Sequence, residues 1–166
     1  MKAKLQFLIL AIAISFASCS EDDSIPNNTL AGDNGFEFER TAYVTDMIYL
    51  TNDNEIILTS RDVSNGTTIQ LDAARFGTIN GDLSEKTYAI NAGLMSCAAI
   101  VDGVWNNGNI ESGDNILGEE NADAGFMRIV HFDAIDEEIT IIFEFTRKDG
   151  KLVSGSYSGN FTRLDI

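Results

Sequence analysis

Residues 139–146 read Ile139-Thr140-Ile141-Ile142-Phe143-Glu144-Phe145-Thr146 and carry the clearest structural pattern in the chain. Ile139, Ile141, Phe143 and Phe145 alternate with residues that are mostly polar. Because successive side chains of a β-strand point to opposite faces, this period of two predicts a strand with one buried face. We therefore expect these four apolar side chains to point into a hydrophobic core.

A turn and a return strand follow. Lys148-Asp149-Gly150-Lys151 contains an Asp-Gly pair, which supplies the positive φ angle that a tight hairpin needs. The return strand places Val153, Tyr157 and Phe161 on one side, with a glycine between each pair. Glycines at such positions let a neighbouring backbone or ring approach closely, or mark a bend. Residues 139–161 are therefore predicted to form a β-hairpin.

The same period of two recurs from residue 36 onward. It predicts strands near residues 36–40, 42–50, 55–63, 67–72, 86–91, 98–106 and 125–133, and turns at Asn65-Gly66, Asn80-Gly81 and Asp102-Gly103. No segment shows a sustained helical stripe, and residues 72–76 are the only candidate for a single helical turn. Short strands joined by Gly and Asn turns predict an all-β fold, an antiparallel β-sandwich, with a small lipocalin-like β-barrel as the alternative.

The N-terminus has the pattern of a cleaved secretory signal. Lys2 and Lys4 precede an apolar run over residues 5–14 that is too short to span a bilayer, and small residues follow it. The cleavage point, Phe16-Ala17-Ser18-Cys19, resembles a bacterial lipobox, in which the peptidase cuts before a cysteine that carries diacylglycerol. The resemblance implies that the Cys19 thiol forms a thioether and that its acyl chains hold the protein on the membrane.

Three further stretches resemble those of small Bacteroidetes lipoproteins with all-β domains. Ser20, Glu21, Asp22 and Asp23 resemble the acidic tag that directs such proteins to the outer face of the outer membrane, although acidic residues also keep a tether solvated. Residues 83–90 and the hairpin of residues 139–161, with Gly155-Ser156-Tyr157-Ser158-Gly159, resemble segments found in the same group. Most members have no known function, so the resemblance implies a fold and a location but no activity.

These features divide the chain into three parts. Residues 1–18 are the predicted signal peptide, residues 19–35 a flexible acidic tether and residues 36–166 a single all-β domain. Roughly sixteen tether residues give an end-to-end distance of about 20–24 Å, which lifts the domain off the membrane.

The charge balance excludes one class of partner. Loss of Lys2 and Lys4 with the signal lowers the formal net charge from −15 to −17. Nucleic-acid binding needs a basic surface, so we exclude nucleic acid as a partner. Binding to anionic lipid head groups is unfavourable because the protein carries the same sign of charge.

After lipidation of Cys19, Cys97 is the only cysteine left with a free thiol. Its apolar surroundings predict a buried, unreactive thiol.

No motif indicates catalysis. His131 is the only histidine, so neither a zinc site nor a Ser-His-Asp triad has the residues it needs, and no metal site is predicted. We expect His131 to share a strand face with Met127 and Ile129. Gly155-Ser156-Tyr157-Ser158-Gly159 differs from a nucleophile elbow because its centre is Tyr. The protein is therefore predicted not to be an enzyme.

The most suggestive candidate for ligand binding is the segment that follows Trp105. It is predicted to be a long polar loop. In one interpretation, Trp105 stacks on a sugar ring while Asn107, Asn109 or Glu111 binds the sugar hydroxyls. Its oxygens also suit Ca²⁺, although their spacing is not that of an EF-hand. The interpretation we favour is a solvated loop with Trp105 buried at the strand end, because loops are usually polar for solubility alone.

Two functions follow from these observations. The first is a surface-tethered, non-catalytic lipoprotein that acts as an interaction or accessory component of the bacterial outer membrane, with an envelope protein or glycan as partner. The alternative is a carbohydrate-binding lipoprotein that uses the loop after Trp105.

Overall fold

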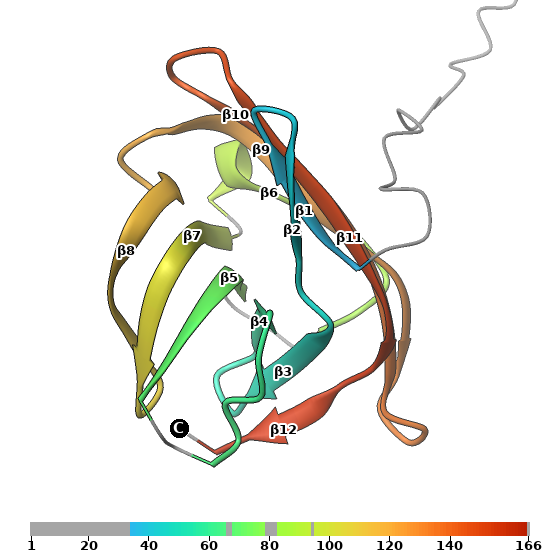
Figure 1. The fold of residues 1–166 in the computed structure, drawn as a ribbon. Helices are drawn as coiled ribbons and strands as arrows, with labels where there is room; N and C mark the ends of the chain where they lie inside the picture. The colour runs from blue at the N-terminus through green and yellow to red at the C-terminus, as the bar shows by residue number, and fades with distance from the viewer. Residues whose placement is uncertain (1–33, 66–67, 79–82, 94, 166) are drawn as a thin grey trace, which may run out of the picture.

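The computed structural model describes residues 34–65, 68–78, 83–93 and 95–165. Within these residues, twelve strands form two six-stranded sheets that pack face to face (Figure 1). The predicted all-β sandwich is confirmed. In the described part of the chain the two sheets remain separate, so the lipocalin-like barrel is not formed.

The first sheet, sheet A, has the strand order β2-β1-β11-β10-β9-β6, and the second, sheet B, has the order β12-β3-β4-β5-β7-β8. All pairings are antiparallel except that of β12 with β3. The strands are β1 (Gly35–Phe38), β2 (Thr41–Val44), β3 (Met47–Thr51), β4 (Glu55–Thr59), β5 (Ile69–Thr78), β6 (Thr87–Ala89), β7 (Met95–Asn106), β8 (Asn109–Leu117), β9 (Ala122–Asp133), β10 (Glu138–Arg147), β11 (Leu152–Asn160) and β12 (Thr162–Leu164). A 3-10 turn, η1 (Ile90–Ala92), follows β6.

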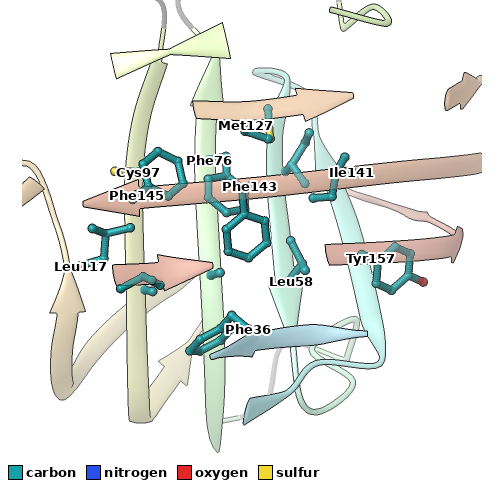
Figure 2. Close-up of a cluster of buried hydrophobic side chains, with 14 of the residues drawn as sticks. Phe36, Leu58, Phe76, Cys97, Leu117, Met127, Ile141, Phe143, Phe145 and Tyr157 are labelled. Carbon is teal, nitrogen blue, oxygen red and sulfur yellow. The ribbon is translucent and has the colours of Figure 1, made fainter. Parts of the chain in front are cut away.

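Strand β10 supplies the centre of the main core. Ile139, Ile141, Phe143 and Phe145 are all buried, as their alternation predicts. Figure 2 shows the last three of these side chains among residues from both sheets, including Phe76 of sheet B. The ring centroids of Phe76 and Phe143 lie 4.7 Å apart. These aromatic contacts join the two sheets across the sandwich.

The predicted hairpin of β10 and β11 is also confirmed. Thr146 pairs with Leu152 at the end of the two strands. A backbone hydrogen bond from the Arg147 N–H to the Lys151 carbonyl closes the turn. Gly155 lies where β11 passes β1 and the Phe143 ring, so a methyl group there would overlap both. This explains the glycine, which the sequence pattern predicts for a close approach.

A second, smaller core covers the outer face of sheet B. It contains Tyr49, Ile57, Val63, Leu71, Ala73, Trp105 and Leu164. Neighbouring residues in the same strands, such as Ile48 and Ile56, face the main core instead. Strands β3 and β4 are therefore buried on both faces, which explains their nearly continuous apolar sequences.

Four predictions about local structure are wrong. The strand predicted over residues 42–50 is two strands, because the chain leaves sheet A after β2 and enters sheet B at β3. Residues 72–76 are not a helical turn but part of β5, and Asp102-Gly103 is not a hairpin turn but lies within β7. The strand predicted over residues 36–40 ends at Phe38, because Glu39 and Arg40 form a two-residue turn with φ angles of 49° and 68°. Both residues of such a turn need positive φ, and the usual glycine or asparagine is absent.

The first described residue is held firmly on sheet A. The Asn34 carbonyl accepts a hydrogen bond from the Thr45 N–H at 3.1 Å, and its side-chain oxygen accepts one from the Ser158 N–H at 2.9 Å. The chain therefore enters the domain between the end of β2 and the C-terminal part of β11.

Candidate functional site

A surface pocket of about 200 Å³ opens where the two sheets meet. The chain passes through Phe161 from β11 in sheet A to β12 in sheet B, and β12 then lies beside β3 (Figure 1). The pocket lies at this crossing. Its walls come from β3, β11, β12 and the segment after β4; they are Asp46, Met47, Ile48, Tyr49, Asp62, Ser64, Tyr157, Asn160 and Thr162.

Tyr49 anchors one wall of the pocket. Its ring belongs to the outer core, while its hydroxyl donates to Asp62 Oδ1 at 2.8 Å and accepts from the Val63 N–H at 3.2 Å. Burial raises the pKa of the Tyr49 phenol to about 12, with the nearby Asp62 carboxylate adding to the effect. The phenol stays protonated at physiological pH, and its proton is used in the hydrogen bond to Asp62.

Asp62 is held in place by the residues around it. Its Oδ1 atom also accepts hydrogen bonds from the Ser64 N–H at 2.8 Å and the Ser64 hydroxyl at 2.6 Å. These bonds from Ser64, together with the bond from Tyr49, lower the pKa of the Asp62 carboxyl below its ordinary value. Asp62 is therefore an exposed, ionised carboxylate with one oxygen turned to the protein.

Tyr157 and Asn160 form the opposite wall. The Tyr157 hydroxyl donates to the Asn160 carbonyl at 2.7 Å, although the Tyr157 side chain is only 4% exposed. Burial raises the pKa of Tyr157, and the negative charge of Asp46 raises it further. Asp46 itself is exposed, and its carboxylate has no hydrogen bond or ion pair among the described residues.

The lining therefore presents mainly hydrogen-bond acceptors. Both tyrosine protons and the Ser64 hydroxyl proton are used inside the protein. The carboxylates of Asp46 and Asp62 remain, and no Lys or Arg belongs to the lining. Such a pocket suits a ligand that donates hydrogen bonds or carries positive charge.

The predicted site after Trp105 has a different structure from the one expected. The segment is not a long loop: Asn107 and Gly108 form a two-residue turn, and strand β8 returns beside β7. Trp105 is 1% exposed and packs in the outer core near the end of β7, which confirms the favoured prediction that it is buried at the strand end. Its ring is therefore not available to a sugar. Its Nε1 has no hydrogen-bond partner among the described residues.

The polar residues of this segment do not surround the indole. Trp105 pairs with Ile110, whereas Asn109 pairs with Asn106 and so lies on the opposite face of the hairpin. Asn107 is exposed in the turn, and Glu111 Oε1 accepts a hydrogen bond from Asn106 Nδ2 at 2.6 Å. The structure therefore does not join Trp105 with Asn107, Asn109 and Glu111 in one site.

A bulge accounts for the position of Trp105. Leu71 of β5 pairs with Gly103 and Ala73 pairs with Ile100, so two residues of β7 oppose one of β5. Asp102 adopts a φ of 51° at this point. The extra residue reverses the face on which the following side chains lie, which brings Trp105 to the outer core.

His131 lies on the outer face of sheet A, and its predicted position is wrong. Thr140 pairs with His131 while Ile141 pairs with Ile129, so Val130 is an extra residue that reverses the alternation. His131 Nδ1 lies 3.3 Å from Glu85 Oε1, and Nε2 lies 3.9 Å from Glu138 Oε2. Both carboxylates are exposed. Among the described residues, no group of three or more His, Cys, Asp or Glu is placed to bind a metal ion.

Cys97 is buried in the main core, as predicted. Its side chain is 5% exposed, and burial raises the pKa of the thiol to about 11. The thiolate fraction at neutral pH is therefore very small.

The lipidation site and the acidic tag lie outside the described residues, because Cys19, Ser20, Glu21, Asp22 and Asp23 all precede Asn34. In the part of the chain that the structure describes, no helix has the length and apolar character needed to cross a membrane. Comparison of the chain with protein-family models, curated proteins and solved structures found no match.

Proposed function

We propose that this chain is a lipid-anchored, non-catalytic interaction component of the bacterial outer membrane, tethered through Cys19 and exposed on the cell surface. The lipobox-like segment at residues 16–19 and the acidic residues 20–23 support the anchor and the location. The strongly acidic composition supports anchorage by acyl chains rather than by attraction to anionic lipid.

The observation that carries the interaction role is the acceptor-lined pocket. It is open to solvent, and its polar walls are fixed by the bonds of Tyr49 to Asp62 and of Tyr157 to Asn160. A site with fixed polar groups needs little rearrangement on binding, which favours recognition. The pocket also adjoins the point where the tether enters, because Thr45 and Ser158, which contact Asn34, precede and follow pocket residues.

Cell fractionation tests the anchor. We expect the wild-type protein in the membrane fraction and Cys19→Ser in the soluble fraction, with Cys97→Ser as the matched control that stays in the membrane. If Cys19→Ser remains in the membrane fraction to the same extent, the anchor is wrong.

Protease treatment of intact cells tests the surface location. We expect added protease to remove the domain from intact cells, and substitution of Glu21, Asp22 and Asp23 by Ala to protect it until the cells are lysed. Resistance of the wild-type protein in intact cells would contradict surface export.

Carbohydrate binding by the segment after Trp105 has less support, because the buried indole offers no stacking surface. We expect a glycan array to give no signal that depends on this hairpin. A signal that is lost on changing Asn107 and Glu111 to Ala, with stability unchanged, would restore this alternative.

A further inference from the structure

We propose that the pocket between β3, β11 and β12 binds a primary ammonium or guanidinium group carried on a short aliphatic stem. This inference rests on the proposed interaction role and names the chemistry that the site recognises. It follows from the size of the pocket, from the acceptors that line it and from the absence of a competing cation in its lining.

Size limits the ligand to one small group. A volume of about 200 Å³ is below the roughly 300–1,000 Å³ of pockets that enclose drug-sized molecules. It suits one extended side chain or a small diamine. The Met47 side chain, 37% exposed, supplies an apolar wall for the stem.

The carboxylate oxygens that have no partner in the described part of the protein favour a ligand that donates hydrogen bonds. Asp62 Oδ1 accepts three hydrogen bonds within the protein, whereas none of the described contacts uses Oδ2. The carboxylate of Asp46 has no protein partner in the described residues. Hydrogen bonds from a cationic donor to a carboxylate are about twice as strong as neutral ones, so these two groups favour an ammonium or guanidinium over a hydroxyl.

Protein cations do not satisfy these carboxylates. The ion pairs of Lys and Arg in the described chain are Arg75 with Glu55, Arg147 with Asp149, and Lys151 with Glu39, all away from the pocket. A cationic ligand therefore neutralises the two carboxylates. Its binding weakens as the salt concentration rises, because both carboxylates are exposed and salt screens their charge.

The same cationic group occurs on free diamines and on the lysine or arginine side chains of a polypeptide, and the experiment separates these sources. The full mature chain with Cys19→Ser, which lacks only the acyl chains, is titrated by NMR with cadaverine, butylguanidine and the peptide acetyl-Gly-Lys-Gly-amide. The neutral isostere 1,5-pentanediol is the control ligand. We expect saturable shifts of the Met47, Tyr49 and Asn160 amides with the cationic probes only.

Asp46→Asn tests the role of charge without disturbing the fold, since the Asp46 side chain makes no contact that holds other residues. We expect it to weaken cadaverine binding about tenfold or more. Asp123→Asn, which removes an exposed carboxylate on β9, is the matched control and should bind as the wild type does. Tighter binding of the peptide than of cadaverine assigns the site to a polypeptide, and the reverse assigns it to a free amine.

The proposal is overturned if no cationic probe binds, if pentanediol binds equally well, or if Asp46→Asn binds as the wild type does. Each of these results leaves the membrane anchor and the surface location untouched, because those depend on cell fractionation and protease treatment. Conversely, loss of the anchor would leave amine binding in solution unchanged.

Discussion

Replacing Tyr49 by Phe tests the network that joins the pocket to the outer core. The change removes only the hydroxyl, which donates to Asp62 Oδ1 at 2.8 Å and accepts from the Val63 N–H at 3.2 Å. Val63 is buried, so its N–H loses an acceptor in a place that water does not readily reach.

The expected cost follows from these two bonds. An unsatisfied buried N–H costs about 1–3 kcal/mol, and the bond to exposed Asp62 adds a smaller amount. We expect Tyr49→Phe to lower the free energy of unfolding by about 2 kcal/mol, which corresponds to a fall in Tm of about 4–8 °C for a domain of this size.

Urea denaturation followed by circular dichroism measures this difference. The matched control is Tyr43→Phe, because the Tyr43 ring stacks on Phe36 at 5.1 Å and its hydroxyl has no hydrogen bond among the described residues. We expect the control to change stability by less than about 0.5 kcal/mol. Equal stabilities of the two variants would refute the role of the hydroxyl.

The pH dependence gives an independent check of the same network. The pKa of Tyr49 rises from the ordinary 10.0 to about 12 on folding, chiefly through burial. Because the folded pKa is the higher one, this stabilisation is complete below pH 10 and is lost as the pH rises from 10 to 12. The stability difference between the wild type and Tyr49→Phe should therefore narrow over that range. A constant difference would contradict the assignment.

Three further predictions concern the cores. Burial raises the pKa of the Cys97 thiol from 9.0 to about 11. At pH 8 we therefore expect Cys97 in the folded protein to react with Ellman's reagent about 100-fold more slowly than in the protein unfolded in urea. Equal rates would show an accessible thiol. Trp105 is the only tryptophan, and its burial predicts blue-shifted fluorescence that shifts to longer wavelength on unfolding, whereas emission near that of free indole would place it in solvent. Gly155→Ala inserts a methyl group against the Phe143 ring and β1, so we expect it to lower the free energy of unfolding in urea by about 1–3 kcal/mol or more. Ser154→Ala, the control, should lower it by less than about 0.5 kcal/mol. Unchanged stability of Gly155→Ala would contradict the close approach.

The fold could be predicted because its core strands carry a regular apolar pattern. In β10, four alternating side chains face one core, and no bulge interrupts their order. Strand β8 could not be predicted in this way, because it is an edge strand and most of its residues are exposed. The Asn107-Gly108 pair is the sequence feature that could have indicated the hairpin of β7 and β8, since this dipeptide is typical of two-residue hairpin turns.

Bulges explain why side-chain faces were harder to predict than strands. One extra residue near Val130 and another near Asp102 reverse the alternation within β9 and β7. The reversal moves His131 to the surface and Trp105 into the outer core. No glycine marks the bulge at Val130, so the sequence offers no signal for it. In β7, Gly103 follows Asp102 directly, and a glycine inside a strand pattern also marks a bulge, but the same pair is typical of a turn.

The pocket could not be predicted because its residues are remote in sequence. The pocket forms only when the chain crosses from β11 in sheet A to β12 in sheet B and β12 pairs with β3, which brings together residues 46–49, 62–64 and 157–162. No single segment among them has the pattern of a binding motif. The site depends on tertiary structure, whereas the predicted lipid anchor depends only on a contiguous stretch of sequence.

Mass spectrometry of the mature protein's N-terminal peptide tests whether Cys19 carries the lipid anchor. If the chain is a lipid-anchored component of the outer membrane, the mature N-terminus is Cys19 with a diacylglyceryl group on its sulfur. A mature chain that retains residues 1–18, or that begins with an unmodified Cys19 thiol, would contradict the account.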